Sequence, residues 1–185
     1  MYHKLILKSI TSLVKILPIN TVLFFNNELN LVIEPKFLIN TLIFLKYHVL
    51  SQFKVLTLIS AVDYLHKKDR FELNYELLSI RFNNRIRIKT KLNEVLGINS
   101  CEFVYSSANW YECEIWDMFG IFFFKHSNLK RILTDYGFEG NPLRKDFPLS
   151  GYVELKYNDI YKRIVNEPLE LAQEYRTFNF LNPWL

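Results

Sequence analysis

The sequence predicts an α+β fold, in which a small, mostly antiparallel sheet carries packed helices and is followed by an extended C-terminal tail. Strand-like apolar runs come in two pairs, each separated by a short polar turn: Thr21–Phe25 with Leu29–Glu34, and Phe71–Phe82 with Arg85–Leu92. Two further stretches, 37–49 and 110–119, have the composition and end signals of helices. Hydrophobic residues make up 50% of the 185 residues and charged residues 23%, which is typical of a chain with a packed core.

The chain divides into three predicted segments: an N-terminal amphipathic extension over residues 1–29, an α+β domain over 30–150 and a tail over 151–185. The extension has no acidic residue before Glu28, and apolar side chains recur along it at helical spacing: Ile6, Ile10, Leu13 and Leu17. We expect an amphipathic helix packed on its own protein or on a partner. A mitochondrial presequence or a surface anchor is the alternative.

The elements of the domain follow from local signals. Pro35 occupies a helix start, and the apolar run 37–45 has about half of the roughly 20 residues that a membrane span needs, so it predicts a buried helix. The β-branched run Phe53–Val62 predicts an inner strand. Asn83 and Asn84 predict a two-residue hairpin turn, and Cys101–Tyr105 predicts a further short strand.

The run Arg85–Leu92 alternates between basic and apolar side chains, so it predicts a strand with one face on the core and the other strongly basic. The basic side chains are Arg85, Arg87, Lys89 and Lys91. Such a face fits an acidic protein partner, and RNA binding is the alternative function. Against RNA, the net charge is only +4 and the nearby aromatics do not form the pattern of an RNA-recognition motif.

The predicted helix 110–119 carries three acids, Glu112, Glu114 and Asp117. Their spacing does not place a carboxylate pair on one helix face, so we expect solvated or salt-bridged side chains rather than catalytic ones. Asn109 is the expected N-cap with Glu112 as its reciprocal partner, and Gly120 is the expected stop.

The remaining candidates predict no enzyme site. The two cysteines have no CxxC pattern and no nearby His partner in the sequence, which argues against a disulfide framework or a zinc site. His126 is a lone histidine, for which a hydrogen-bonded structural role is expected. The glycines of 137–142 lack the spacing of a phosphate-binding loop. The segment Arg144-Lys145-Asp146, between two prolines, predicts either partner docking or intrachain ion pairs.

Residues 111–154 resemble the signature of the thirty-kilodalton core subunit family of respiratory complex I. The matching residues are Glu112, Glu114, Trp116, Asp117, Phe119, Gly120 and Ile121, then His126, Leu129, Arg131, Ile132 and Leu133, and finally Gly140 with 142–148. The resemblance extends over most of residues 30–185. This chain departs from the pattern at Cys113, Ser127 and Asn141, and the serine in place of a proline is expected to loosen a turn.

The resemblance implies a non-catalytic core subunit of the hydrophilic arm of NADH–ubiquinone oxidoreductase, on the matrix side of the mitochondrial inner membrane. It implies contacts with the forty-nine-kilodalton and N2-cluster-bearing subunits, a tail that wraps a neighbour, and no contact with nucleic acid. FMN and iron–sulfur clusters are then expected on other subunits, and this chain is expected to bind no cofactor. The partner-docking residues are predicted to be Arg85, Arg87, Glu112, Glu114, Asp117, His126, Arg131, Arg144, Lys145 and Asp146.

Overall fold

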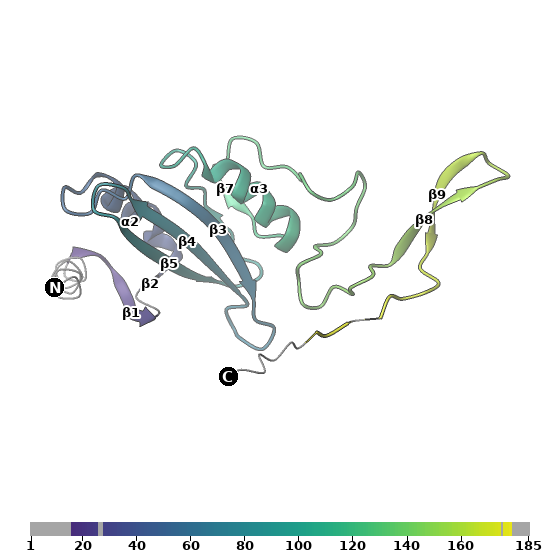
Figure 1. Ribbon diagram of the computed structural model, residues 1–185, viewed down its shortest axis with the longest axis horizontal. Helices are drawn as coiled ribbons and strands as arrows, with labels where there is room; N and C mark the ends of the chain where they lie inside the picture. Colours follow the sequence, from purple (N-terminus) through teal and green to yellow (C-terminus); the bar gives the residue numbers. More distant parts are fainter. Residues whose placement is uncertain (1–15, 26–27, 175, 179–185) are drawn as a thin grey trace, which may run out of the picture.

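The structure, a computed structural model, describes residues 16–25, 28–174 and 176–178. A body formed by a twisted sheet and its helices occupies one end of the molecule, and a two-stranded arm projects from the other end (Figure 1). The amphipathic helix predicted near the N-terminus falls almost wholly on residues 1–15, which lie outside the described residues.

The body is built on a five-stranded sheet with the order β1-β2-β5-β4-β3. Both predicted hairpins are confirmed, because β1 pairs with β2 and β4 with β5 in antiparallel fashion. Within this sheet, only β2 and β5 run parallel, with Leu29 opposite Ile86. The strand bounds are β1 (Ile19–Phe25), β2 (Glu28–Ile33), β3 (Val55–Asp63), β4 (Phe71–Ser79) and β5 (Asn84–Leu92). The sheet is therefore mostly antiparallel, as predicted.

Three local predictions are wrong. Strand β3 lies at the edge of the sheet rather than inside it. Its apolar sequence reflects cover from a helix, because Ser107 and Tyr111 donate hydrogen bonds to the carbonyls of Leu56 and Thr57 on that strand, at 3.3 and 2.9 Å. The β4–β5 turn contains four residues, 80–83, since Ser79 pairs with Asn84. Residues 101–105 form turns, in which the N–H groups of 104 and 105 both bind the carbonyl of 101.

The helices pack against the sheet in one core. They are η1 (Pro35–Phe37), α2 (Leu38–Tyr47) and α3 (Ala108–Phe119), with the short parallel pair β6 (Ile98–Asn99) and β7 (Phe123–Phe124) beside α3. The predicted alternation of β5 is confirmed, because its apolar side chains are buried with those of neighbouring elements: Leu31, Leu42, Leu45, Leu73, Tyr75, Leu77, Ile86, Ile88, Leu92 and Ile115. No described helix is long and apolar enough to cross a membrane.

The C-terminal region contains a hairpin that the sequence did not predict. Strands β8 (Val153–Asn158) and β9 (Arg163–Pro168) pair antiparallel and form the arm of Figure 1. None of residues 151–174 is buried, which contrasts with the sheet of the body. Strand β8 alternates between apolar and polar side chains, but β9 has two adjacent apolar residues and ends in Pro168, so the sequence shows no clear pair of strands.

Candidate functional site

The motif-bearing segment 140–147 closes the C-terminal end of helix α3. The last carbonyls of a helix have no hydrogen-bond donors within the helix, and here one loop supplies the donors. Asn141 Nδ2 donates to the carbonyl of Asp117 at 3.0 Å, Leu143 N–H to that of Met118 at 3.1 Å, and Arg144 Nε to that of Phe119 at 2.7 Å. The guanidinium also places a positive charge at the negative end of the helix dipole. Gly120 ends the helix with φ 73°, as predicted.

Asp117 attaches a second loop to the same helix. Its side chain is fully buried, and one carboxylate oxygen accepts the backbone N–H groups of Ile132, Leu133 and Thr134 at 3.0, 2.7 and 3.0 Å. The other oxygen accepts the Thr134 hydroxyl at 2.6 Å. Burial opposes ionisation, but these hydrogen bonds outweigh it and lower the pKa of Asp117. The predicted solvated acid is therefore an internal anchor for residues 132–134.

Glu112 is likewise fully buried, so it is neither solvated nor the reciprocal cap, and His126 Nε2 lies 3.8 Å from its carboxylate. Its carboxylate accepts the Ser100 hydroxyl at 2.5 Å and the Cys101 N–H at 2.8 Å. Burial raises the pKa of this carboxyl. The helix begins one residue earlier than the predicted cap, and the Asn109 side chain binds Glu102 instead, at 2.6 Å. The capping box fails because the tertiary fold offers Glu112 closer donors on the segment that enters the helix.

His126 has the structural role expected of it. Its Nδ1 accepts the Asn128 N–H at 3.1 Å, so the ring proton lies on Nε2, which faces the carbonyl of Asn109 at 3.2 Å. Cys113 Sγ lies 3.9 Å from the same nitrogen, so the fold gives this cysteine a histidine neighbour that its sequence surroundings do not show. The fold joins two positions that are 13 residues apart in the sequence.

A charged network joins the motif segment to the end of the sheet. Arg70 holds both oxygens of Asp63, at 2.8 and 2.9 Å, and also Asp146 at 2.8 Å. Hydrogen bonds from Arg70 lower the pKa of both carboxyls. Arg144 pairs with Glu94 at 2.7 Å. Arg144 and Asp146 thus make the intrachain ion pairs that were one of the two alternatives for this segment. The side chain of Lys145 between them is exposed, so partner docking stays open for that residue.

The predicted strongly basic face of β5 is not uniformly basic. Arg87 pairs with Glu76 at 2.8 Å and with Glu28 at 3.1 Å, and Lys89 pairs with Glu72 at 2.8 Å. Carboxylates from β2 and β4 therefore interleave with the basic side chains. This pairing removes the observation on which the RNA-binding alternative depended.

The ten predicted docking residues therefore differ in their availability. Within the described ranges, only three of them have exposed side chains without a hydrogen bond or ion pair: Arg85, Glu114 and Lys145. Arg131 is exposed but already has partners, since it donates to the carbonyl of Gly140 at 3.0 Å and lies 3.7 Å from Asp117. A docking role stays a prediction for all ten. Sequence reasoning missed Asp63, Arg70 and Glu94, whose neighbours come from distant segments.

The comparison with known families decides where this arrangement belongs. The chain matches the family described as "Respiratory-chain NADH dehydrogenase, 30 Kd subunit" over residues 31–153. The chain belongs to this family. The resemblance of the motif run in residues 111–154 to the 30 Kd family is thereby confirmed.

Individual relatives agree with the 30 Kd assignment. The chain is 50% identical over 175 residues to "NADH-ubiquinone oxidoreductase subunit 9" of Reclinomonas americana, covering 94% of this chain and 86% of that protein. It is 55% identical over 148 residues to "NADH dehydrogenase (ubiquinone) iron-sulfur protein 3" of Solanum tuberosum, covering 80% and 78%. A solved chain of an archaeal membrane-bound sulfane sulfur reductase shares the fold, with a TM-score of 0.67 at 22% identity, covering 77% of this chain and 85% of that one.

The name of the Solanum tuberosum relative contains "iron-sulfur", so the residues of this chain can be compared with those that such a cluster needs. Clusters of this kind are usually held by four cysteine thiolates. The whole sequence contains only two cysteines, and Cys101 and Cys113 are both buried. Across the described ranges, no three His, Cys, Asp or Glu side chains are placed to hold a metal ion. The residues present do not fit an iron–sulfur cluster.

Two departures from the 30 Kd pattern have clear structural roles. Ser127 donates its N–H and its hydroxyl to Glu102, at 2.9 and 2.7 Å. A proline would lack the N–H, so the turn at this position is fixed by hydrogen bonds rather than loosened as expected. Asn141 supplies the amide that binds the end of α3.

Proposed function

We propose that this chain is a non-catalytic structural subunit of the hydrophilic arm of respiratory complex I. It would sit on the matrix side of the mitochondrial inner membrane and help hold the quinone-reducing module, beside the forty-nine-kilodalton and N2-cluster-bearing subunits. FMN and the iron–sulfur clusters would be carried by other subunits. Family membership supports this proposal, as does the use of Glu112, Asp117, His126 and Arg144 in intrachain contacts.

The observation that carries the proposal is the uncovered apolar face of the β8–β9 arm. Residues directly opposite one another in the two strands share a face, and Tyr157 pairs with Ile164. One face therefore presents Val153, Leu155, Tyr157 and Ile164, whose exposed fractions lie between 56% and 66%. The other face carries charges, at Glu154, Lys156, Arg163 and Glu167. The arm thus has the amphipathic pattern of a sheet with one face on a core, although no described residue of the chain buries that face.

The energetics favour a partner on this face. An isolated two-stranded hairpin is at best marginally stable in water. Full burial of a large apolar side chain contributes about 1.5–3 kcal/mol. Covering these four side chains would therefore stabilise the arm by several kcal/mol. A neighbouring subunit with an apolar surface supplies such a cover.

The test compares the two faces of the arm. In the organism that expresses this protein, the wild-type chain is replaced by a variant with Leu155→Ser and Tyr157→Ser, or by a control variant with Glu154→Gln and Lys156→Gln. On native gels of solubilised membranes, we expect wild type and control to migrate with NADH dehydrogenase activity and the apolar-face variant to be lost from that band. Equal behaviour of the two variants would contradict docking through this face. A wild-type chain found only as a free monomer would contradict the proposed function.

A further inference from the structure

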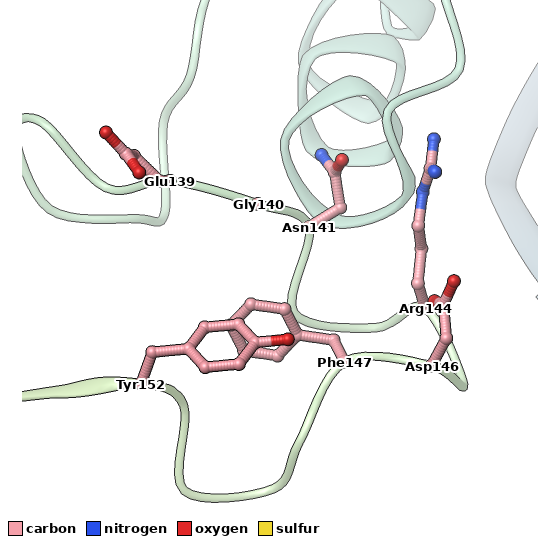
Figure 2. Close-up of a pocket in the computed structure, with 7 residues that line it drawn as sticks. All are labelled: Glu139, Gly140, Asn141, Arg144, Asp146, Phe147 and Tyr152. Carbon is pink, nitrogen blue, oxygen red and sulfur yellow. The ribbon is translucent and has the colours of Figure 1, made fainter. Parts of the chain in front are cut away.

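A surface pocket lies between the motif loop and the start of the arm. Its volume is about 330 Å³, and seven residues line it: Glu139, Gly140, Asn141, Arg144, Asp146, Phe147 and Tyr152 (Figure 2). All of them belong to the described residues, and none has a role in the docking face of the arm. The pocket therefore constitutes a second candidate contact with another molecule.

Aromatic rings form one wall of the pocket. Phe147 and Tyr152 meet edge to face, with ring centroids 5.5 Å apart, and Figure 2 shows both rings below the chain segment 139–141. The Phe147 ring lies directly against Gly140, where an added Cβ would meet it at 2.8 Å. Gly140 also has a φ of 98°, which favours glycine. The Phe147 ring is thus held in place by Gly140 and by Phe138, whose ring centroid lies 5.9 Å away, while the Tyr152 ring is 66% exposed and can attract a cation.

The charge of the pocket is negative once the ion pairs are assigned. Arg70 and Arg144 are the guanidinium groups of the adjoining network, and its carboxylates are Asp63, Glu94 and Asp146. Asp146 uses one oxygen for Arg70, and its side chain remains 53% exposed. Glu139 at the rim is exposed and has no side-chain hydrogen bond or ion pair to the described residues. Together these groups contain two more carboxylates than guanidiniums.

The arginines near the pocket are not available to an anion, and the exposed side chain of Lys145 is not among those that line the pocket. Arg144 uses Nε for the carbonyl of Phe119 and Nη1 for Glu94, and Nη2 lies against Gly120. Arg131, which donates to the carbonyl of Gly140, lies beside Asp117. The free carboxylate oxygens and the ring faces are therefore the groups that remain to bind a ligand.

We propose that this pocket receives an arginine or lysine side chain from a partner protein. The aliphatic stem and cationic head would lie on the rings of Phe147 and Tyr152, and the head would reach the carboxylates of Asp146 and Glu139. The identity of the partner as another subunit of the same enzyme rests on the proposed function. The chemistry of the pocket does not rest on it, because a cation over aromatic rings beside the free oxygen of Asp146 and the carboxylate of Glu139 can come from any partner.

A side-chain-resolution structure of the whole complex, isolated from native membranes, tests the proposal directly. We expect a lysine or arginine of a neighbouring chain over the Tyr152 ring and within hydrogen-bond distance of Asp146 or Glu139. A pocket open to solvent, or filled by an apolar or acidic side chain or by residues 179–185 of this chain, would overturn it. The arm is visible in the same structure, so a covered arm beside an empty pocket would leave the proposed function intact.

A salt titration of the complex adds a measurement with matched variants. Glu139→Lys reverses a charge at the pocket rim, and Glu34→Lys reverses a partly exposed acid outside the pocket, which pairs with Lys36 at 2.6 Å. We expect Glu139→Lys to lower the amount of chain that stays bound to the complex during the salt titration by about tenfold, and Glu34→Lys to change that amount less than about twofold. Thermal unfolding of each free chain checks that both variants fold. Equal retention of the two folded variants would overturn the pocket proposal.

Discussion

The sheet body and the β8–β9 arm have the same kind of strands in opposite surroundings. In the body, Leu73, Tyr75 and Ile88 have no exposed surface, and the inner strands β2, β5 and β4 each contact two other strands. In the arm, the corresponding apolar side chains are more than half exposed, and the two strands contact chiefly each other. Strand pairing alone therefore does not make a core. The body is stabilised by its own packing, and we infer that the arm is stabilised by its partner.

The segment between the sheet body and the β8–β9 arm, residues 128–147, shows where the body ends. Residues 128–147 have little regular structure and many exposed side chains, so they look like part of the arm. Nevertheless, Asp117 binds residues 132–134, and the end of α3 binds residues 141–144. In energetic terms this segment belongs to the body. The following experiments test that division, from the largest expected effect to the smallest.

Asp117→Ala should give the largest loss of stability. Three backbone N–H groups and one hydroxyl lose their acceptor, and each unsatisfied buried group costs about 1–3 kcal/mol. We expect the free energy of unfolding to fall by about 3–5 kcal/mol in urea titrations of the free chain. Glu114→Gln, on the same helix but exposed, serves as the control and should change it by less than about 0.5 kcal/mol. Similar values for both variants would place residues 132–134 outside the body.

A matched pair of apolar truncations compares the two regions directly. Ile88→Ala leaves a cavity in the sheet core, and we expect a loss of about 2–5 kcal/mol in the free chain. Leu155→Ala removes a side chain that is 64% exposed in the arm, so the free chain should change by less than about 0.5 kcal/mol. In the assembled complex, Leu155→Ala should in turn weaken retention of the chain. A large loss for Leu155→Ala in the free chain would show that the arm packs on the body.

Arg144→Ala should have an intermediate effect. It removes a charged hydrogen bond to the carbonyl of Phe119 and the pair with Glu94, and bonds of this kind contribute about 1.5–3 kcal/mol. Lys145→Ala, which removes an exposed side chain, is the neighbouring control and should leave the free chain unchanged. Loss of folding and of assembly to the same extent would support an intrachain role for Arg144. Loss of assembly alone would restore the docking role predicted from the sequence.

The smallest effect concerns pH. Hydrogen bonds from the Ser127 N–H and hydroxyl, then from Asn109, lower the pKa of Glu102 to about 2. Because the folded pKa is lowered, the stabilisation is complete above the ordinary pKa of about 4.5 and disappears as the pH falls towards about 2. The side chain is partly exposed, so we expect only about 1 kcal/mol at pH 6.

The measurement is urea unfolding of wild type and Glu102→Gln at several pH values. The variant should be less stable at pH 6, and the two curves should converge as the pH falls. A difference that stays constant with pH would show that the carboxylate charge of Glu102 does not contribute. The amide of the variant retains the volume, which separates charge from packing.

Local pattern predicted much of the body. The alternation of Arg85–Leu92 predicted which side chains of β5 are buried, and Gly120 predicted the end of α3. Both signals depend on neighbouring residues in the chain. The position of β3 at the sheet edge could not be predicted in this way, because a helix-covered edge strand is as apolar as an inner one. The β8–β9 hairpin was missed because β9 lacks the apolar–polar alternation of β8.

By itself, the sequence determined the fold class, the two hairpins of the body and, through the motif run in residues 111–154, the 30 Kd family. Only the tertiary structure decided what the motif side chains do. Arg70 meets Asp146 across 76 positions, Arg144 meets Glu94 across 50, and the Lys145 N–H meets Asp63 across 82. The physical reason is that a buried or half-buried charge needs a partner nearby in space, and the chain brings that partner from any distance along its length.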